Sequence, residues 1–437
     1  MKKVLIVAYY FPPMGMGGVQ RATKFVKYLP EFGWDPVVLT VKDVSYYARD
    51  VSMLGDVKNA SVYRTGSLDP LRLHWLLSGK KKSSSMDQAT GKRQPYLFNR
   101  LNTVVLSKFL IPDSKVLWLP HAIFRAGKIV KDIKPDLICT TSPPHSAHCV
   151  GWALKAKFGI PWIMDFRDRW FHEMYQTDIP GLHRQFGKWL YGKMSASADS
   201  VVAVSAPIAE KLSCLYKKNA PNVFVLPNGF DPSDFPDPDK KRTSDKFTFT
   251  YCGTFNAFLN PMILLKALQN VMEKIPGIKK RMQFVFAGNA PDIHLQKLIK
   301  EMGLSGLFRS AGYVSHSKSI QYLVDSDLLF FLLPTNAGPG MITGKIFEYL
   351  ASGKPILAAV PDGEASDLLK RFRGHTVVSP DDSTMISDEI IRLFRLWEKG
   401  RLKKSSSFDK RLRSFDRRNQ TGELAGLFDK VCRCQVP

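Results

Sequence analysis

The chain has 437 residues, of which 44% are hydrophobic and 23% charged. This is ordinary for a folded protein, and the length suits two domains of roughly 200 residues each. No run reaches the ~18 consecutive apolar residues that cross a bilayer, which argues against an integral membrane protein. The net charge of +24 favours an anionic partner, namely a phosphorylated substrate, an anionic lipid surface or nucleic acid. A basic surface that serves only solubility is the alternative.

The cysteines and the N-terminus bear on the cellular compartment. No CxxC pair occurs among the six cysteines, and Cys432 and Cys434 lack partner ligands at zinc spacing. The chain enters a strand directly at Val4, without the apolar region and cleavage site of a signal peptide. We therefore expect reduced thiols, no structural zinc, and a protein of the cytoplasm or of a membrane face.

Strands alternate with helices from the N-terminus onward, which is typical of a parallel α/β sheet. The first strand, 4–8, leads through a glycine-rich loop into an amphipathic helix over 19–32. Gly17 and Gly18 let a ligand approach the backbone, and a helix start attracts phosphate. The dinucleotide fingerprint fails, because Gln20 stands where its third glycine belongs. Further strands are predicted at 36–41, 136–140, 161–165, 200–204 and 222–226, and further helices at 122–134, 146–158 and 206–216.

Residues 66–125 are the least regular part of the chain. Lys80, Lys81 and Lys82 follow Trp75, and further basic and aromatic residues come after them. This mixture suits an anionic membrane surface. The alternative is a disordered insertion followed by an ordinary packing helix. RNA binding is not favoured, because no recognisable RNA-binding signature lies beside the basic residues.

Ionisable residues follow two of the predicted strands. Arg167 and Asp168 come directly after strand 161–165, and His145 ends the loop after the preceding strand. Parallel α/β sheets bind ligands at the carboxyl ends of their strands, so we predict that these three residues face a ligand. Two alternatives remain, a structural ion pair for Arg167 with Asp168 and a helix-cap role for His145.

A second series of strands and helices follows a stretch rich in Pro, Asp and Lys at 234–246, which we interpret as a linker. Gly253 and Thr254 follow the first strand of this series. A basic amphipathic helix is predicted from Phe408 onward. The strands of this half are predicted at 247–251, 284–288, 311–314, 328–333 and 356–360.

Two patterns in this half imitate known ligand sites. Asp325 and Asp327 form the D-x-D pattern of some metal sites, but a strand follows directly, so we interpret them as a helix end. Gly344-Lys345 imitates a P-loop, yet Ile346 replaces the Ser or Thr that binds Mg²⁺. The sequence therefore predicts no metal site.

The stretch 339–369 carries the strongest functional signal. Thr343, Gly344 and Lys345 lie at the predicted start of a short helix, where free N–H groups and the positive end of the helix dipole attract anions. Glu348 lies three residues further on and shares a face with Lys345. A cation and N–H donors beside a carboxylate suit a ligand that has both phosphates and hydroxyls, such as a nucleotide sugar. The alternative is an ordinary amphipathic helix.

This stretch resembles the donor-site signature of retaining GT-B glycosyltransferases of family 4. Its closest pattern, S/T-x-K-x-x-E-Y-x-x-x-G-K-P, is that of a branch that builds bacterial surface polysaccharides. Gly340 stands where the first glutamate of the family's E-x7-E pair is usual, as in that branch. Three further segments resemble the family's G-G-x-x-R, D-x-R-D-x-W and P-N-G-x-D segments, and they lie at 17–21, 165–170 and 227–231.

The resemblance implies a GT-B architecture, with two doubly wound Rossmann-like α/β domains facing a cleft. An acceptor-side domain over 1–233 would be joined by the linker 234–246 to a nucleotide-sugar domain over 247–405. A C-terminal helix, 406–437, would then cross back to the first domain. A free membrane-binding helix is the alternative for this last segment.

The resemblance also implies the transfer of a sugar, with retention, from a UDP- or GDP-sugar to a lipid-linked or saccharide acceptor. The reaction would take place at the cytoplasmic face of the inner membrane. It would require no cofactor and no essential metal, and the enzyme would bind no specific nucleic acid. Lys345 would meet phosphate charge and Glu348 the ribose, while Asp168 or His145 would assist the acceptor beside Arg167. A nucleotide-sugar 2-epimerase and a non-catalytic binding protein on the same scaffold are the alternatives. The implied donor-side residues are Gly17, Gly18, Gly253, Thr254, Tyr313, Val314, Thr343, Gly344, Lys345 and Glu348.

Overall fold

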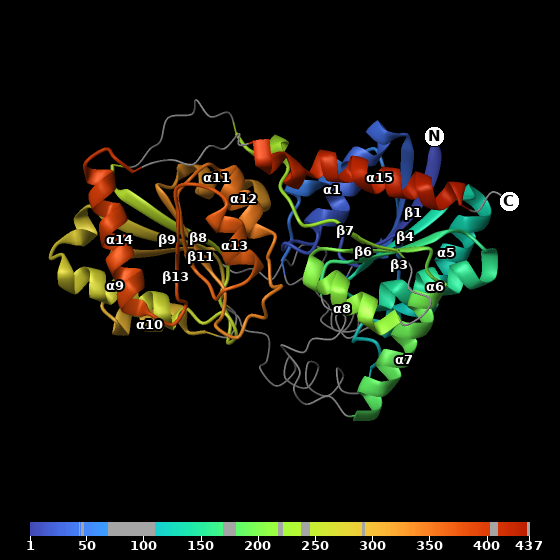
Figure 1. Ribbon diagram of the computed structural model, residues 1–437, viewed down its shortest axis with the longest axis horizontal. Coiled ribbons are helices and arrows are strands. Elements are labelled where there is room, and N and C mark those ends of the chain that lie inside the picture. Colours follow the sequence, from blue (N-terminus) through green and yellow to red (C-terminus); the bar gives the residue numbers. More distant parts are fainter. Residues whose placement is uncertain are drawn as a thin grey trace. The chain divides into compact units, whose positions relative to one another are not determined.

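The protein folds into two compact units, Met1–Asn228 with Arg417–Pro437, and Gly229–Asp416 (Figure 1). Each unit is an α/β sandwich with its own parallel sheet. The computed structural model describes residues 1–42, 44, 48–68, 110–168, 181–216, 222–236, 245–290, 293–402 and 410–434.

In the described residues of unit 1, seven parallel strands form a sheet in the order β3-β2-β1-β4-β5-β6-β7. They are β1 Lys2–Val7, β2 Trp34–Val41, β3 Ser61–Thr65, β4 Leu137–Ser142, β5 Trp162–Phe166, β6 Ser200–Ala203 and β7 Asn222–Val225. Its helices are α1 Gln20–Tyr28, α5 Leu119–Ile133, α6 Ser146–Phe158, α7 Gly181–Ser197, α8 Ala206–Tyr216 and α15 Arg417–Arg433, with 3-10 turns η1 Leu29–Phe32, η2 Ser52–Val57 and η5 Val116–Trp118.

Two cores cover the two faces of this sheet. Helices α5 to α8 bury their apolar side chains on one face, and α1 and α15 bury theirs on the other. The central strands are therefore buried on both sides, which is why they are continuous apolar runs in the sequence.

The C-terminal helix α15 belongs to unit 1, but it begins at Arg417, and residues Lys410–Phe415 form a 3-10 turn of unit 2. Leu424, Phe428 and Val431 are buried in the core beneath it, and the Phe428 ring lies 5.3 Å from the Trp34 ring, centroid to centroid. The alternative of a free membrane-binding helix is wrong, because this apolar face is already covered. Phe408, where the helix was predicted to begin, lies outside the described residues.

The part of unit 2 that the structure describes has six parallel strands in the order β10-β9-β8-β11-β12-β13. They are β8 Phe247–Thr254, β9 Met282–Asn289, β10 Phe308–Gly312, β11 Leu328–Leu332, β12 Ile356–Ala359 and β13 His375–Val378. The strand order reverses between β8 and β11, the place where such sheets bind ligands. Its helices are α9 Met262–Lys274, α10 Leu295–Glu301, α11 His316–Asp325, α12 Lys345–Ala351, α13 Glu364–Lys370 and α14 Ser383–Glu398, with 3-10 turns η7 Pro232–Asp234, η8 Ile278–Lys280 and η9 Lys410–Phe415.

The structure confirms the predicted α/β class and corrects some elements. Strand β10 occupies 308–312 rather than 311–314, and its end coincides with Gly312, whose φ is +69°. Most of the irregular segment, 69–109, and most of the linker, 237–244, lie outside the described residues. The elements without any counterpart in the prediction include β3, α7, β13 and α14.

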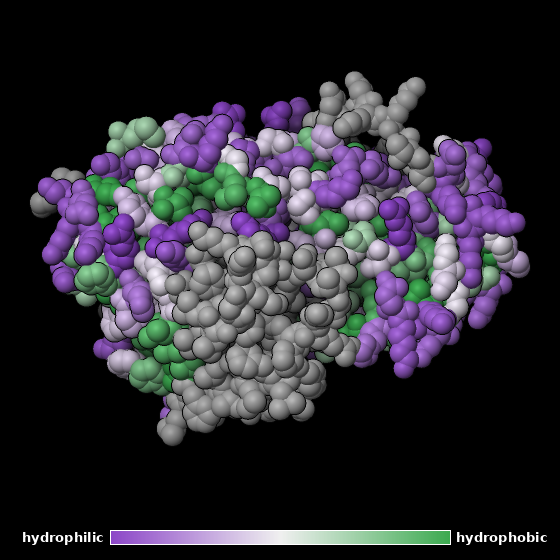
Figure 2. All heavy atoms as spheres, turned by 180° about the vertical axis from the view of Figure 1, so that it is seen from behind, coloured by the Kyte–Doolittle hydropathy of each residue, from purple (hydrophilic) through white to green (hydrophobic). Residues whose placement is uncertain are grey.

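The surface of the described residues is largely hydrophilic, in agreement with the content of charged residues. Hydrophilic residues cover much of the face shown in Figure 2, with smaller hydrophobic areas between them. Within the described ranges, no helix is both long and apolar enough to cross a membrane. The six cysteines are free, as expected.

Candidate functional site

Helix α12 is fixed in unit 2 by its apolar face and by one tyrosine. Ile346, Phe347 and Leu350 are buried in the core. The Tyr349 hydroxyl accepts a hydrogen bond from the Cys252 backbone N–H at 2.9 Å and donates to the carbonyl of the same residue at 3.3 Å. These contacts bind α12 to strand β8 and so determine where Lys345 and Glu348 lie.

Lys345 reaches the carboxyl end of β8. Its ammonium lies 3.3 Å from the Tyr251 hydroxyl and 4.9 Å from the centroid of the Tyr251 ring. A Cβ on Gly253 would lie 2.1 Å from the Lys345 Nζ, so the lysine occupies the space that a side chain would need. On β9, Gly288 has no room for a side chain either, because a Cβ there would lie 1.6 Å from the Gly253 carbonyl oxygen. The glycines at the ends of β8 and β9 therefore leave space beside the Lys345 ammonium.

Glu348 is held by a histidine. Its Oε1 lies 2.9 Å from Nε2 of His316, the first residue of α11, and His316 Nδ1 lies 3.8 Å from Oδ2 of Asp234. The three side chains are only 11%, 9% and 17% exposed for Glu348, His316 and Asp234 respectively. The histidine therefore fixes the carboxylate that the sequence assigned to ligand hydroxyls, and leaves its second oxygen without a hydrogen bond from this ring.

His316 and Asp234 were missed by the sequence analysis. They come from α11 and η7, far from Glu348 in the chain, and no spacing rule connects them. The only local signal is that His316 directly follows Tyr313-Val314-Ser315, a segment already interpreted as ligand-facing.

Thr343, two residues before Lys345 in the chain, carries a hydroxyl group. Its Oγ1 is buried and has no hydrogen-bond partner among the described residues. A buried hydroxyl without a partner is costly, so this atom is a candidate for a hydrogen bond to a ligand. Gly344 follows it, and a Cβ there would meet nothing within 4 Å.

The other predicted donor-side residues of unit 2 lie at the ends of strands or in the loops that follow them. Thr254 is the last residue of β8, and its carbonyl accepts a hydrogen bond of 3.4 Å from the Tyr251 hydroxyl. Tyr313 and Val314 are half-buried in the loop between β10 and α11. This loop leads directly to His316, the residue that contacts Glu348.

In unit 1 the glycine-rich loop leads to a buried ion pair. The Arg21 guanidinium binds Asp165 through Nε, 3.1 Å from each oxygen, and through Nη2 at 2.8 Å. It also donates to the Pro227 carbonyl at 2.9 Å. Both side chains are 1–2% exposed. The arginine of the G-G-x-x-R segment therefore joins α1 to β5 inside the unit.

Gly18 makes room for a second arginine. A Cβ there would lie 3.2 Å from Nη1 of Arg167, whose Nε and Nη2 donate to the Ser142 and Pro143 carbonyls at 3.1 and 2.7 Å. Burial lowers the pKa of Arg167, and the charges of Asp165 and Asp168 oppose this. Gly17 is exposed and a Cβ on it would meet nothing.

The acceptor-side candidates lie in different environments. Asp168 is exposed, whereas His145 is only 3% exposed and directly precedes α6, with its ring 6.2 Å from that of Phe166. Burial, with a smaller contribution from the charge of His145, holds the pKa of nearby His148 well below its usual value. The structure therefore groups Arg167 with Gly18, and leaves the roles of Asp168 and His145 as predictions.

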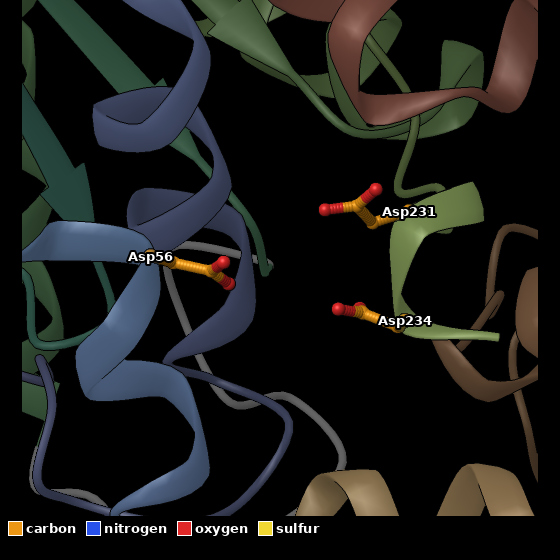
Figure 3. Close-up of side chains that lie close together, drawn as sticks. All are labelled: Asp56, Asp231 and Asp234. Carbon is orange, nitrogen blue, oxygen red and sulfur yellow. The ribbon is translucent and has the colours of Figure 1, made fainter. Parts of the chain in front are cut away.

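The carboxylates that imitate metal sites have structural contacts. Asp325 ends α11, as predicted, and Asp327 accepts hydrogen bonds from the Thr248 N–H at 2.7 Å and from Trp397 Nε1 at 3.1 Å. Figure 3 shows Asp231 and Asp234 on the turn that includes η7, together with Asp56, which belongs to unit 1 and pairs there with two lysines. In the described part of the chain, neither unit by itself holds three grouped metal-ligand side chains.

Comparison with protein families gives two matches that together cover most of the chain. Residues 16–229 match the model of the glycosyl transferase 4-like domain, and residues 246–395 match that of glycosyl transferases group 1. A search of curated protein sequences found no match.

Solved structures resemble the chain over its whole length. A glycosyltransferase from Rickettsia africae has a TM-score of 0.65 at 15% identity, with 100% of this chain and 99% of that one covered. Sucrose-phosphate synthase from Thermosynechococcus elongatus has a TM-score of 0.64 at 14% identity and full coverage of both chains. HepE from Anabaena, in complex with UDP, has a TM-score of 0.63 at 15% identity, with coverage of 98% and 100%.

The two parallel sheets and these matches define a transferase enzyme of the GT-B fold. The chain belongs to the family 4-like glycosyltransferases.

Proposed function

We propose that this enzyme transfers a sugar from a UDP- or GDP-sugar, and that the nucleotide binds at the carboxyl ends of β8 and β11. The observation that carries the proposal is the grouping of Lys345 at Gly253 with a fixed carboxylate, Glu348, three residues along the same helix. HepE, a protein of the same fold, was crystallised with UDP and with UDP and glucose.

Each of three groups has a separate part in donor binding. Lys345 opposes the charge that develops on the leaving diphosphate, and preorganised charge of this kind is typically the largest contribution to catalysis. Glu348 accepts hydrogen bonds from the ribose hydroxyls through its oxygen away from His316. The buried Thr343 hydroxyl donates to a phosphate oxygen. No essential metal is needed in this scheme, because protein groups meet the phosphate charge.

In the reaction, the bond between the anomeric carbon and the diphosphate oxygen breaks, and a bond to the acceptor oxygen forms. The acceptor hydroxyl loses its proton, with Asp168 or His145 as the assisting group. The resemblance to family 4 supports retention of configuration, with the acceptor approaching on the face that the diphosphate leaves.

We further propose that the acceptor is lipid-linked or a growing polysaccharide of a bacterial surface, and that the enzyme works at the cytoplasmic face of the inner membrane. The support is the net charge of +24 and the resemblance of residues 343–355 to the surface-polysaccharide branch. Arg167, placed beside Gly18 at the end of β5, is the cation available for an acceptor group.

A panel of nucleotide sugars, with and without EDTA, tests the proposal. We expect one donor to release its nucleoside diphosphate, faster with acceptor present and equally well in EDTA. UDP released from a UDP-N-acetylhexosamine, with the sugar never transferred, would indicate the 2-epimerase instead. No release from any donor would favour a non-catalytic scaffold, to which Gly340 in place of a glutamate already points. Activity lost in EDTA and restored by Mn²⁺ would contradict the metal-free scheme.

A further inference from the structure

Helix α7 presents two large aromatic rings to the surface of unit 1. Phe186 is 47% exposed and Trp189 is 52% exposed, and their ring centroids lie 5.2 Å apart. Exposed aromatic side chains of this size that lie together are uncommon without a partner. The pair was not part of any sequence prediction.

The periodicity of α7 explains why these rings point outward. Its buried residues, Leu190, Tyr191 and Met194, follow the spacing of one helical face. Phe186 and Trp189 lie three residues apart on another face, which the core does not cover. One end of α7 also projects away from the sheet of unit 1 (Figure 1).

Basic residues are also exposed on α7. Arg184, Lys188 and Lys193 are exposed on α7, and the helix contains no acidic residue. The three helices α5, α6 and α7, which cover one sheet face and contact one another in that order, contain eight lysines and arginines and a single acidic residue, Asp132.

The same combination occurs on α5. Phe124 is 67% exposed, and the Lys128 ammonium lies 4.6 Å from the centroid of its ring. Aromatic rings that lie among lysines and arginines are typical of helices that rest in a membrane interface, where the rings enter the head-group region and the cations meet anionic lipids.

We propose that the exposed face of α7, formed by Arg184, Phe186, Lys188, Trp189 and Lys193, binds an anionic lipid surface. The inference deepens the proposed function, since a lipid-linked acceptor requires unit 1 to reach the bilayer. A second copy of the chain suits this face poorly, because two such faces would bring like charges together.

Co-sedimentation of the full chain with lipid vesicles tests this inference. We expect binding to phosphatidylcholine vesicles that contain phosphatidylglycerol, little binding to phosphatidylcholine alone, and release at 1 M salt, where the Debye length is about 3 Å. The double variant Phe186→Ser, Trp189→Ser and the double variant Arg184→Glu, Lys188→Glu should each weaken binding about tenfold or more.

Matched changes on unit 2 serve as controls. Met385→Ser removes a side chain that is 46% exposed on α14, and Lys266→Glu with Lys300→Glu reverses two exposed charges on α9 and α10. The affinity of these variants for the vesicles should lie within about twofold of that of the wild type. An equal loss in the α7 and control variants would mean that only total charge or hydrophobicity matters, and would overturn the assignment to α7.

Other outcomes would also overturn it. Vesicle binding that survives in both α7 variants would place the lipid surface elsewhere, and a dimer that these variants abolish would make the face a contact between copies. Salt-sensitive RNA binding without vesicle binding would assign it to nucleic acid. Transfer of the sugar to a water-soluble acceptor, with release of the nucleoside diphosphate, tests the proposed function separately, because the α7 variants should retain this activity in the absence of lipid.

Discussion

Glu348 owes its position to His316 as much as to its own helix. The 2.9 Å contact with the histidine takes one carboxylate oxygen, and Asp234 lies 3.8 Å from the other ring nitrogen. A carboxylate fixed in this way would meet ribose hydroxyls without first losing side-chain entropy, which would otherwise weaken binding. We therefore propose that His316 is a positioning residue for the nucleotide.

Removal of the histidine should weaken ribose recognition specifically. We expect His316→Ala to raise the KM for the donor several-fold while changing kcat less, and to reduce the preference for a ribonucleotide over its 2′-deoxy and 3′-deoxy analogues. Calorimetric titration of these nucleoside diphosphates into wild type, His316→Ala and Glu348→Ala measures the coupling. An unchanged ribose preference in His316→Ala, lost in Glu348→Ala, would show that Glu348 acts without help from His316.

At this scale the sequence predicted residues within one element better than partners between elements. Lys345 and Glu348 were found because a helix places residues three apart on one side. His316 and the space at Gly253 were not, because contacts between α11, α12 and β8 depend on packing that local spacing does not encode. The resemblance of segment 17–21 to the family's G-G-x-x-R segment likewise includes Arg21, but only the structure shows that this arginine pairs with Asp165.

Among the secondary-structure elements, the end of β8 determines where the Lys345 ammonium lies. A Cβ at Gly253 would meet the Lys345 Nζ at 2.1 Å and the Tyr251 hydroxyl at 3.1 Å, and the φ of this glycine is +156°, which residues with a side chain rarely adopt. Gly253→Ala should therefore both destabilise unit 2 and displace the cation, and we expect kcat of the folded protein to fall by roughly 10²-fold, as on loss of one charge-stabilising group.

Steady-state kinetics with the best donor measures this effect, and circular dichroism confirms folding. Gly127→Ala on α5 is the control, because a Cβ there meets nothing within 4 Å. Full activity of Gly253→Ala would show that the position of Lys345 at the strand end is unimportant.

Strand β13 contains a histidine that should make unit 2 sensitive to acid. Burial lowers the pKa of His375 to about 4, and neither ring nitrogen has a hydrogen-bond partner in the described structure. The unfolded chain, with a pKa near 6.5, therefore binds more protons between about pH 6.5 and 4, so stability falls as pH decreases through this range, by about 3 kcal/mol in all.

Replacement of His375 should remove much of this loss of stability at acidic pH. We expect His375→Phe to unfold in urea at a denaturant midpoint that changes less between pH 7 and pH 4.5 than that of the wild type. His121→Phe, at an exposed histidine of α5, is the control. Parallel pH dependences for wild type and His375→Phe would exclude His375 as the cause.

The sequence predicted most buried strands but missed elements with mixed patterns. Central strands such as β1 and β11 are continuous apolar runs, which only a sheet covered on both faces explains. Helix α7 was missed because its outer face carries aromatic residues and its sequence includes glycines, which disturb the apolar periodicity. Strand β3 was missed because it is short and half-buried at the sheet edge.

For the whole molecule we propose two kinds of site. Lys345 and Glu348 of unit 2 are the proposed nucleotide site, and the face of α7 in unit 1 is the proposed contact with an anionic bilayer. The charge of +24 fits both, since a diphosphate and a lipid head group are anions. The two sites lie in separate units, so their variants should have independent effects.

The central claim is that Lys345 and Glu348 bind the nucleotide of the donor. Isothermal titration of nucleoside, monophosphate and diphosphate into the wild type and two variants tests it most directly. Glu348→Ala should weaken all three by roughly 1–3 kcal/mol, the cost of unpaired buried groups, and Lys345→Ala should weaken the diphosphate most. Lys300→Ala and Glu301→Ala on α10 should change nothing. Wild-type affinities for all three ligands in folded Lys345→Ala and Glu348→Ala proteins would contradict the account.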